Sequence, residues 1–406
     1  MLGAITSVVL AAVLASASAT HAATSACVVP VRQGARELVS VTEASRQECL
    51  RCARMLGPQP VLSVDAMRRG PGSASAIPDE PVYCAFVPYQ MRLKRSGKSR
   101  KFWCRLTNAA GSYYNDRHEL VEEAVAVSSS GLLLDGVGRL LLDDAGRPQA
   151  PSVIKVKYST GDNRGREVHT EVAASRLFWA LGFPADRVYP ARVFCRGCTG
   201  DPFDDIRTED ENRARSGTSY FPRASVEHKL PGRPIQTEED QGWSWKEAYA
   251  HAKPDPARRS EFEAYVLAAN LIHFHNGLDK QNTLVCESGG WDEASGACST
   301  PVAYLDDMGA SFGGGSSRAS HSLFVRNTVF TTAGACALRA DLAGFGGVSE
   351  AARQLLVRRL DALSEPMVRT IFEVAGFTPE NTGASLEQWT AAFTARIREV
   401  KAASCR

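Results

Sequence analysis

The chain has 406 residues, of which 44% are hydrophobic and 23% are charged, which is ordinary for a globular protein large enough for two lobes. Its formal net charge is +2, so the composition gives no reason to expect binding to nucleic acid or to an anionic membrane surface. No run of 18 apolar residues follows the N-terminal stretch, so a stable membrane span is not expected.

The first 22 residues have the features of a secretory signal peptide. Residues 8–15 form an apolar core, and Thr20-His21-Ala22 fits a small-x-small cleavage site. Residues 1–6 carry no Lys or Arg, which leaves a mis-assigned start or a retained anchor as alternatives. We therefore expect an exported protein, periplasmic or extracellular after cleavage.

Eleven cysteines also favour export, because cytosolic proteins seldom carry so many without a metal role. Cys49/Cys52 and Cys195/Cys198 have CxxC spacing, but 142 residues lie between the two pairs, so disulfides are favoured over a zinc site. Cys286 is expected to pair with Cys298, and Cys195 with Cys198 or a near neighbour. Residues 23–88 hold four of the cysteines and are predicted to form a Cys-rich N-terminal extension.

Residues 89–235 are predicted to be rich in β-strands. Short apolar or alternating runs stand between turn residues, at 102–106, 131–134, 139–142, 153–158, 187–195 and 224–230. The six basic residues within 91–101 are interpreted as a solvated hairpin or loop. Gly136 and Gly138 indicate a further hairpin, and no internal repeat is apparent.

The strand predicted over 153–158 reads VIKVKY, and its alternation places Lys155 and Lys157 on one face. A helix is predicted to follow over 167–181, ending before Gly182. Glu167 and Glu171 are four residues apart and therefore share one face of that helix. The alternative is a surface strand with solvated lysines.

A break in composition at residues 231–234 (PGRP) separates the strands from a helical region, residues 236–406. Helices are predicted over 349–363, 365–375 and 386–400, the last with Ser385 and Gln388 as a capping box. Strands followed by helices make this an α+β chain.

Within the helical region, residues 273–313 form a polar hairpin. Two short apolar strands are predicted, at 283–285 and 302–305. Asp279 and Asn282 precede the first strand, and Asp306 and Asp307 follow the second. Polar oxygens at the matching ends of a hairpin can hold a divalent cation such as Mg²⁺ between them.

This hairpin resembles the catalytic hairpin of the protein-kinase-like superfamily, in which a metal-binding Asn precedes a strand pair and an Asp-x-Gly follows it. Asn282 and the sequence Asp307-Met308-Gly309 match those positions. The nearer branches are the phosphatidylinositol kinases, the bacterial persistence-toxin kinases and the secretory-pathway kinases, with exported bacterial proteins of the same layout closest. The resemblance covers about residues 130–375 and implies a two-lobed fold with a β-rich N-lobe and a helical C-lobe.

The resemblance also implies roles for individual residues. Asn282 and Asp307 would bind Mg²⁺, and Lys155 or Lys157 would contact the phosphates of ATP with Glu171 fixing the lysine. The segment 226–229, with Glu227 and His228, would present backbone groups to adenine. Asp279 would accept the proton of the acceptor hydroxyl, with His275 a weaker candidate, and Asp306 would be structural.

One departure leaves the activity open. The atypical kinases place the catalytic Asp five residues before the Asn, where this chain has Gly277, while Asp279 lies three residues before it. The chain is therefore either a kinase acting on an unknown protein or small-molecule hydroxyl, or an inactive pseudokinase that serves as a binding module. A hydrolase using His169, His273 and Asp307 is a weaker alternative, because no Gly-x-Ser-x-Gly motif frames a nucleophile.

Overall fold

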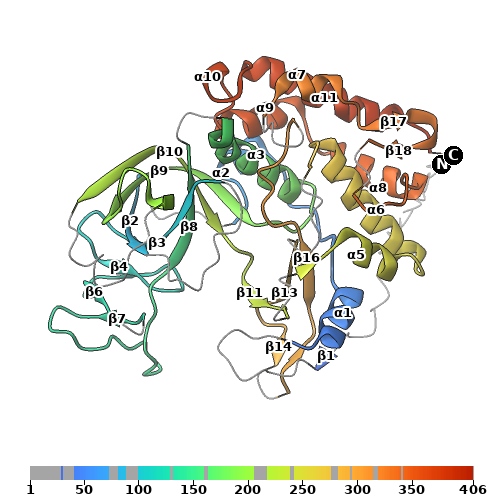
Figure 1. Ribbon diagram of the computed structural model, residues 1–406. Helices are drawn as coiled ribbons and strands as arrows, with labels where there is room; N and C mark the ends of the chain where they lie inside the picture. Colours follow the sequence, from blue (N-terminus) through green and yellow to red (C-terminus); the bar gives the residue numbers. More distant parts are fainter. Residues whose placement is uncertain are drawn as a thin grey trace, which may run out of the picture.

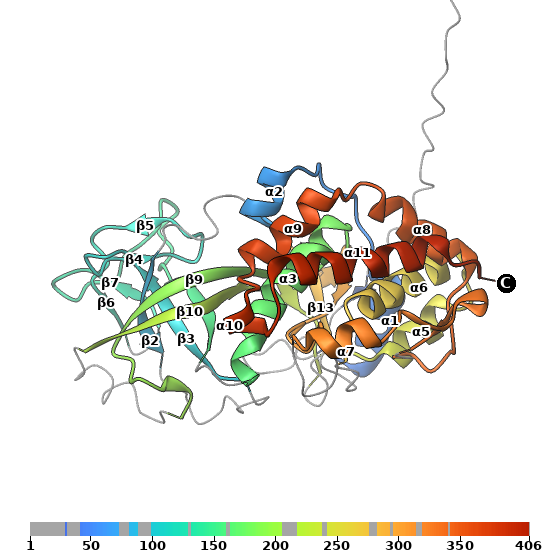
Figure 2. The same ribbon diagram turned by 90° about the horizontal axis from the view of Figure 1, so that it is seen from above.

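The computed structural model describes residues 29–30, 41–72, 81–87, 99–128, 131–159, 163–204, 217–237, 242–275, 282–292, 295–313, 319–339 and 342–405. Most strands of the first half of the chain gather at one end of the molecule, and the helices, together with the later short strands, lie at the other, as Figures 1 and 2 show from two directions. The described chain is therefore of the α+β class, as expected.

The strands of the first half form a seven-stranded sheet in the order β2-β9-β10-β8-β3-β4-β5. Because β2 also pairs with β3, the strands β2, β9, β10, β8 and β3 close on themselves as a five-stranded barrel. Its interior holds buried side chains such as Phe86, Phe102, Val156, Val193 and Val226. The bounds are β2 Val82–Val87, β3 Lys101–Thr107, β4 Tyr113–Tyr114, β5 Leu120–Val121, β8 Val153–Tyr158, β9 Arg187–Arg196 and β10 Thr218–His228.

The strands predicted at 102–106, 153–158 and 187–195 correspond to β3, β8 and β9. The strand predicted at 224–230 starts earlier and ends earlier, as β10. β2 lies before the expected boundary at residue 89 but pairs within the barrel sheet. Of the basic run at 91–101, residues 91–98 lie outside the described part of the chain.

Between β3 and β8 the chain makes one turn repeatedly, which inspection of the sequence did not reveal. In five places an Asn, Ser or Asp side chain accepts a hydrogen bond from the backbone N–H four residues later. The residue before that N–H has a positive φ in every case. The five turns begin at Asn108, Asn115, Ser128, Asp135 and Asp143. We call residues 108–149 the turn-repeat segment; it includes β6 Ala126–Val127 and β7 Leu133–Leu134.

The second half of the described chain is mainly helical around one large core. The predicted capping box of Ser385 and Gln388 is present at the start of the last helix. The ten helices in the described residues are α1 Glu43–Cys52, α2 Val64–Arg69, α3 Glu167–Ala180, α5 Trp245–Ala252, α6 Pro256–Leu271, α7 His321–Arg326, α8 Glu350–Leu360, α9 Glu365–Val374, α10 Pro379–Thr382 and α11 Leu386–Ala402. None of the helices in the described ranges is long and apolar enough to cross a membrane.

The predicted polar hairpin is formed by β13 Asn282–Glu287 and β16 Pro301–Tyr304, paired antiparallel with Thr283 opposite Tyr304. β11 Gly232–Pro234 and β12 Gly242–Trp243 extend the same sheet beside β13. Three short strands make a second sheet, in which the N-terminal β1 Val29–Pro30 pairs with β15 Ala297–Cys298 and β14 Trp291–Asp292 lies beyond. β17 Phe330–Thr332 and β18 Ala337–Leu338 form a small hairpin near the C-terminal helices.

Four disulfides join described cysteines, including the two that were predicted, Cys286–Cys298 and Cys195–Cys198. The other two are Cys84–Cys104, between β2 and β3, and Cys336–Cys405. Cys52 is also disulfide-bonded, while Cys49 is a free, buried thiol. The two CxxC pairs therefore do not make a zinc site, because Cys195, Cys198 and Cys52 are all consumed by disulfides.

Candidate functional site

One buried lysine meets three carboxylates where the barrel faces α3 and the end of β16. The Nζ of Lys157, on β8, lies 2.7 Å from Glu171 Oε1, 3.0 Å from Glu167 Oε1 and 2.9 Å from Asp307 Oδ1. The predicted strand lysine, helix glutamate and hairpin aspartate are thus in contact, although they are distant in the sequence. Glu167, on the same face of α3, is a third partner to which the sequence analysis gave no role.

Burial and the neighbouring charges shift the pKa values of the groups in this cluster in opposite directions. Burial alone would lower the pKa of the Lys157 ammonium, but Asp307, Glu171 and Glu167 outweigh it and raise that pKa well above 10.5. Burial raises the pKa of Glu171 to about 8, although Lys157 acts against it. Burial would likewise raise the pKa of Asp307, but Lys157 and Lys155 dominate and hold it below its usual value. Asp307 is therefore ionised, and its side chain is 35% exposed against 2% for Lys157.

The Asp307-Met308-Gly309 turn is fitted closely against the first turn of α3. Asp307 has a left-handed backbone with φ 43°, and its N–H donates to Asp306 Oδ1 at 2.9 Å. The Thr170 hydroxyl, on α3, donates to the Gly309 carbonyl at 2.6 Å. A Cβ at Gly309 would lie 2.1 Å from Glu167 Cγ, so only glycine allows this approach. The Asp-x-Gly sequence is thus needed here for packing as well as for its carboxylate.

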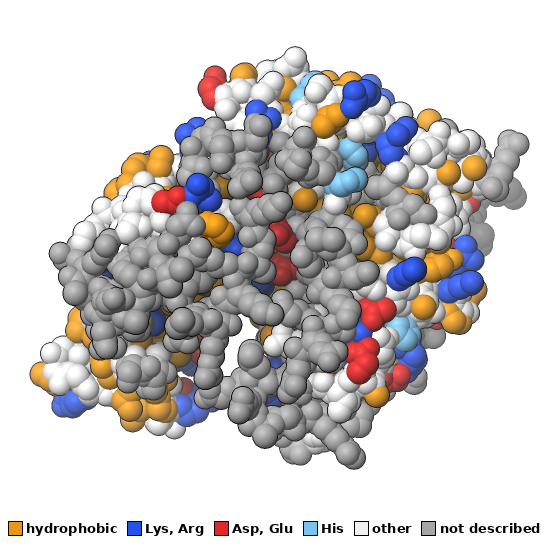
Figure 3. Space-filling model, viewed as in Figure 1, with side chains coloured by type: hydrophobic (Ala, Val, Ile, Leu, Met, Phe, Trp, Pro, Cys, Tyr) orange, Lys and Arg blue, Asp and Glu red, His pale blue; other side chains and the backbone are white. Residues whose placement is uncertain are grey.

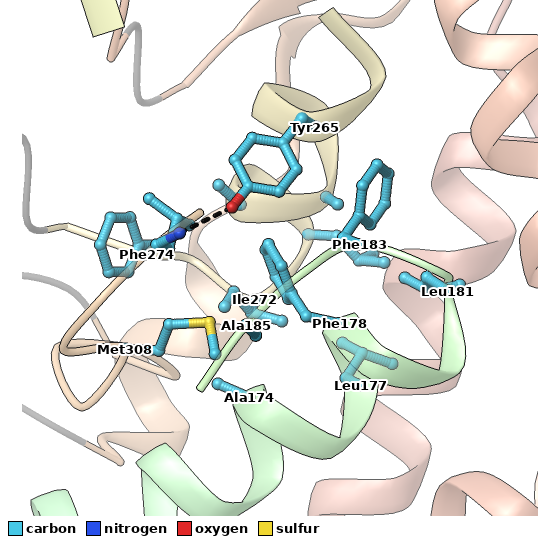
Figure 4. Close-up of a cluster of buried hydrophobic side chains, with 14 of the residues drawn as sticks. Ala174, Leu177, Phe178, Leu181, Phe183, Ala185, Tyr265, Ile272, Phe274 and Met308 are labelled. Atoms are coloured by element: carbon cyan, nitrogen blue, oxygen red, sulfur yellow. Dashed lines mark hydrogen bonds between the residues drawn. The ribbon is translucent and has the colours of Figure 1, made fainter. Parts of the chain in front are cut away.

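The middle residue of the turn, Met308, anchors it in the hydrophobic core. Met308 is buried and lies in one cluster with Ala174 and Phe178 of α3 and with Ile272 and Phe274 after α6 (Figure 4). The Tyr265 hydroxyl, on α6, accepts a 2.8 Å hydrogen bond from the Leu305 N–H, two residues before Asp307. Helix, hairpin end and turn are therefore held in one packed unit that fixes where Asp307 stands.

The second predicted lysine, Lys155, contacts a different acid. Its Nζ lies 2.5 Å from Glu227 Oε2, directly across the β8–β10 pair, so Glu171 holds Lys157 and not Lys155. Lys229 extends this network, because its Nζ lies 2.8 Å from Glu227 Oε1, 2.8 Å from Asp186 Oδ2 and 2.5 Å from Asp306 Oδ1. Burial raises the pKa of Glu227, but Lys155 and Lys229 overcome it and the net pKa is lowered.

Asp186, Glu227 and Asp306 have carboxylate oxygens within 4.8 Å of one another, a spacing compatible with a metal ion. The ammonium of Lys229 already pairs with all three. Asp306 is therefore part of an ion-pair network centred on Lys229.

A cavity of about 470 Å³ adjoins this network. Lys155 and Val153 of β8, Trp103 of β3, and Glu227 with His228 of β10 contribute to its wall. The chain that leaves β10, residues 229–232, completes that side. The segment predicted to meet adenine therefore borders a cavity, one lined by charged as well as aromatic side chains.

Of the two remaining predicted site residues in the hairpin, Asn282 and Asp279, the structure describes only Asn282. Asn282 is buried at the start of β13, and its side-chain amide donates to the Trp243 carbonyl at 3.1 Å. Asp279 and Gly277 lie outside the described residues, so the roles given to them stay predictions.

The residues of the weaker hydrolase alternative have structural surroundings of their own. His169 Nδ1 lies 2.7 Å from the Ala375 carbonyl oxygen inside the protein. His273 is buried just after α6, where burial, Arg396 and His275 lower its pKa to about 4. Asp307 is paired with Lys157, so these three residues are placed by different partners.

Sequence reasoning missed Glu167, Lys229 and Asp186. Glu167 carried a usable signal, because it precedes Glu171 by one helical turn. Lys229 and Asp186 carried none, since their association depends on the pairing of β9 with β10 and on the end of β16.

No family model matches the chain. No curated protein matches it either. Among solved structures, the chain is similar to the crystal structure of a Helicobacter pylori proinflammatory kinase, CtkA, with a TM-score of 0.37 and 8% sequence identity over 78% of this chain and 94% of that one. Such a likeness concerns the fold at most.

Proposed function

We propose that the chain is an exported kinase-like protein that binds Mg²⁺·ATP and transfers phosphate to a hydroxyl acceptor. The observation that carries the proposal is the contact of Lys157 with both Glu171 and Asp307. A strand lysine held by a helix glutamate, beside an aspartate after a hairpin, is the set of groups that phosphoryl transfer uses to position phosphates and metal. We interpret the strand-rich and helical ends as the two lobes.

The cluster suggests how charge would be distributed when nucleotide binds. Lys157 would neutralise phosphate oxygens, with Glu171 and Glu167 keeping its ammonium in place. Asp307 is the most exposed of the four groups and carries an oxygen donor of the kind Mg²⁺ prefers, with Asn282 as the second proposed ligand. The cavity between Lys155 and the chain after β10 is the proposed position of the base.

Transfer itself would depend on Asp279, which we propose as the group that orients the acceptor hydroxyl. The three-residue spacing from Asp279 to Asn282 favours a second candidate, a pseudokinase that binds nucleotide or a partner without catalysis. The four disulfides between described cysteines are consistent with the exported setting that both candidates share.

Calorimetry on the purified, oxidised protein tests the nucleotide site. Wild-type protein should bind ATP in the presence of Mg²⁺ and lose most of that affinity with EDTA. Asp307→Asn should remove the Mg²⁺ dependence, because the ionised carboxylate that would meet the metal is gone. Asp361→Asn, at an exposed ion pair with Lys401, is the matched control and should bind as wild type does. If wild-type protein ignores Mg²⁺·ATP, both the kinase and the nucleotide-binding pseudokinase are excluded.

A further inference from the structure

We propose that the turn-repeat segment carries a docking groove for a basic protein segment with a central apolar side chain. This proposal is independent of the nucleotide site. Of the nine large hydrophobic side chains exposed among the described residues, five lie in the turn-repeat segment. They are Leu120, Val125, Val137, Leu140 and Leu142. Hydrophobic side chains gather over β6 and β7 at the lower left of Figure 3.

Such a concentration needs an explanation, because soluble proteins seldom expose apolar side chains close together without a partner. The fold itself does not require them to be apolar. The small core under the segment is formed by other residues, Ala85, Tyr113, Ala124 and Leu133. Val137 is 76% exposed and Leu142 is 53% exposed, so neither contributes much to that core.

A groove of about 330 Å³ shows where a partner would sit. Leu120, Val121 and Leu142 contribute its apolar lining, and Leu120 and Leu142 are exposed. Five carboxylates and one arginine, Arg117, stand around them. The carboxylates belong to Glu119, Glu122, Glu123, Asp143 and Asp144. Glu119 pairs with Arg117 and Asp143 with Arg147, so the five acids still outnumber the two arginines that contact them.

Charge complementarity selects the occupant. An apolar side chain on Leu120 and Leu142 would be flanked by acids, so the segment that carries it should have Lys or Arg on either side. Nucleic acid and anionic lipid would be repelled by the same carboxylates. A symmetric contact between two copies would set acidic groove against acidic groove, so a second copy is disfavoured. The occupant is therefore a basic segment of another protein.

Fluorescence anisotropy with the full-length protein tests this proposal. The probe is a labelled peptide, Gly-Lys-Arg-Leu-Leu-Arg-Lys-Gly, and the comparison peptide has Gly in place of both leucines. The first should bind more tightly, and binding should weaken as ionic strength rises. Leu142→Ser should weaken binding by about tenfold, the scale of losing one buried aliphatic side chain. Glu123→Gln should weaken it and reduce the salt dependence.

Matched controls lie elsewhere on the surface. Val325→Ser removes a side chain that is 58% exposed on α7, and Glu365→Gln removes an exposed acid in the first turn of α9. Both should bind the probe as wild type does, and thermal unfolding should show that all variants are folded. The proposal is overturned if the two peptides bind equally, or if Leu142→Ser binds like Val325→Ser. A concentration-dependent dimer that Leu142→Ser abolishes would also overturn it, by assigning the groove to a second copy.

Discussion

Lys157 and Asp307 form an ion pair of 2.9 Å across 150 residues of sequence. The cation that would meet phosphate and the carboxylate that would meet metal thus neutralise each other. A phosphate–metal complex could replace both halves of this pair at once, because it offers an anion to Lys157 and a cation to Asp307. The greater exposure of Asp307 indicates the side from which such a ligand would approach.

Replacing Lys157 should destabilise the protein strongly. Lys157→Met leaves the carboxylates of Glu167, Glu171 and Asp307 together without their cation, and breaking such a buried pair typically costs about 3–5 kcal/mol. Urea denaturation measures the change in the free energy of unfolding. Lys401→Met, at an exposed ion pair, should cost about 1 kcal/mol or less. Equal effects of the two substitutions would show that the Lys157 cluster is not a buried charge network.

A substitution at Asp279 distinguishes the kinase hypothesis from the pseudokinase hypothesis. A group that orients the acceptor hydroxyl acts in the transition state, so Asp279→Asn should leave Mg²⁺·ATP affinity unchanged. It should lower phosphate incorporation, into the protein itself or a generic acceptor, by roughly 10²–10⁴-fold. Incorporation is followed with labelled ATP beside calorimetry. A wild type that binds nucleotide but incorporates nothing, with Asp279→Asn unchanged from it, would establish the pseudokinase.

Any side chain at position 309 should destabilise the protein as long as the Glu167 side chain occupies its present position. In Gly309→Ala the new methyl group would overlap Glu167 Cγ, and overpacking of this kind costs about 1–3 kcal/mol. The melting temperature should fall, whereas Gly200→Ala, with open space around its Cβ, should change it little. Adding Glu167→Ala to Gly309→Ala should recover part of the loss. If the double variant loses as much stability as the two single variants combined, the strain does not come from the contact between residues 309 and 167.

His273 should contribute to loss of stability in acid. Burial, with Arg396 and His275, lowers its pKa to about 4 from 6.5. The unfolded chain therefore binds a proton at this position between those values while the folded protein does not. The stability that His273 contributes is present above pH 6.5 and is lost as pH falls towards 4. One such group adds at most about 1.4 kcal/mol per pH unit to the slope of unfolding free energy.

The matched measurement is urea denaturation of wild type and His273→Asn from pH 4 to 7. The variant should show a shallower dependence over that window, whatever its stability at pH 7. Parallel curves would mean that His273 titrates alike in both states.

The strand and the helix that carry the lysine–glutamate contact could be predicted from sequence because local periodicity determines both elements, whereas the contact itself was implied by the resemblance to kinases. The alternation of VIKVKY predicted β8 with its bounds, and the helical pattern after it predicted α3 within one residue. Which lysine meets Glu171 was left open, since both share one face of the strand. The pairing of Lys155 with Glu227 depends on the β8–β10 register, which a single strand pattern does not contain.

The turn-repeat segment went unrecognised for a different reason. Its turns begin with three residue types, Asn, Ser or Asp, and have Gly or His at the positive-φ position. What recurs is a hydrogen-bonding geometry, which those side chains can supply interchangeably, and not a residue identity. The network around Lys229 likewise joins three stretches that only the folded chain brings together.

Closure of the barrel is a late step in the folding of the chain. β2 pairs in parallel with β9, with Val82 opposite Val193, so the barrel cannot close until both strands are available. Before then one edge of β2 offers unsatisfied backbone groups to any extended segment nearby. Contacts this remote in sequence are slow to form, because the loop between them must first give up its conformational freedom. A chain that crosses a membrane N-terminus first would expose that edge on the far side, where a holdase chaperone could protect it until the strand more than a hundred residues later arrives.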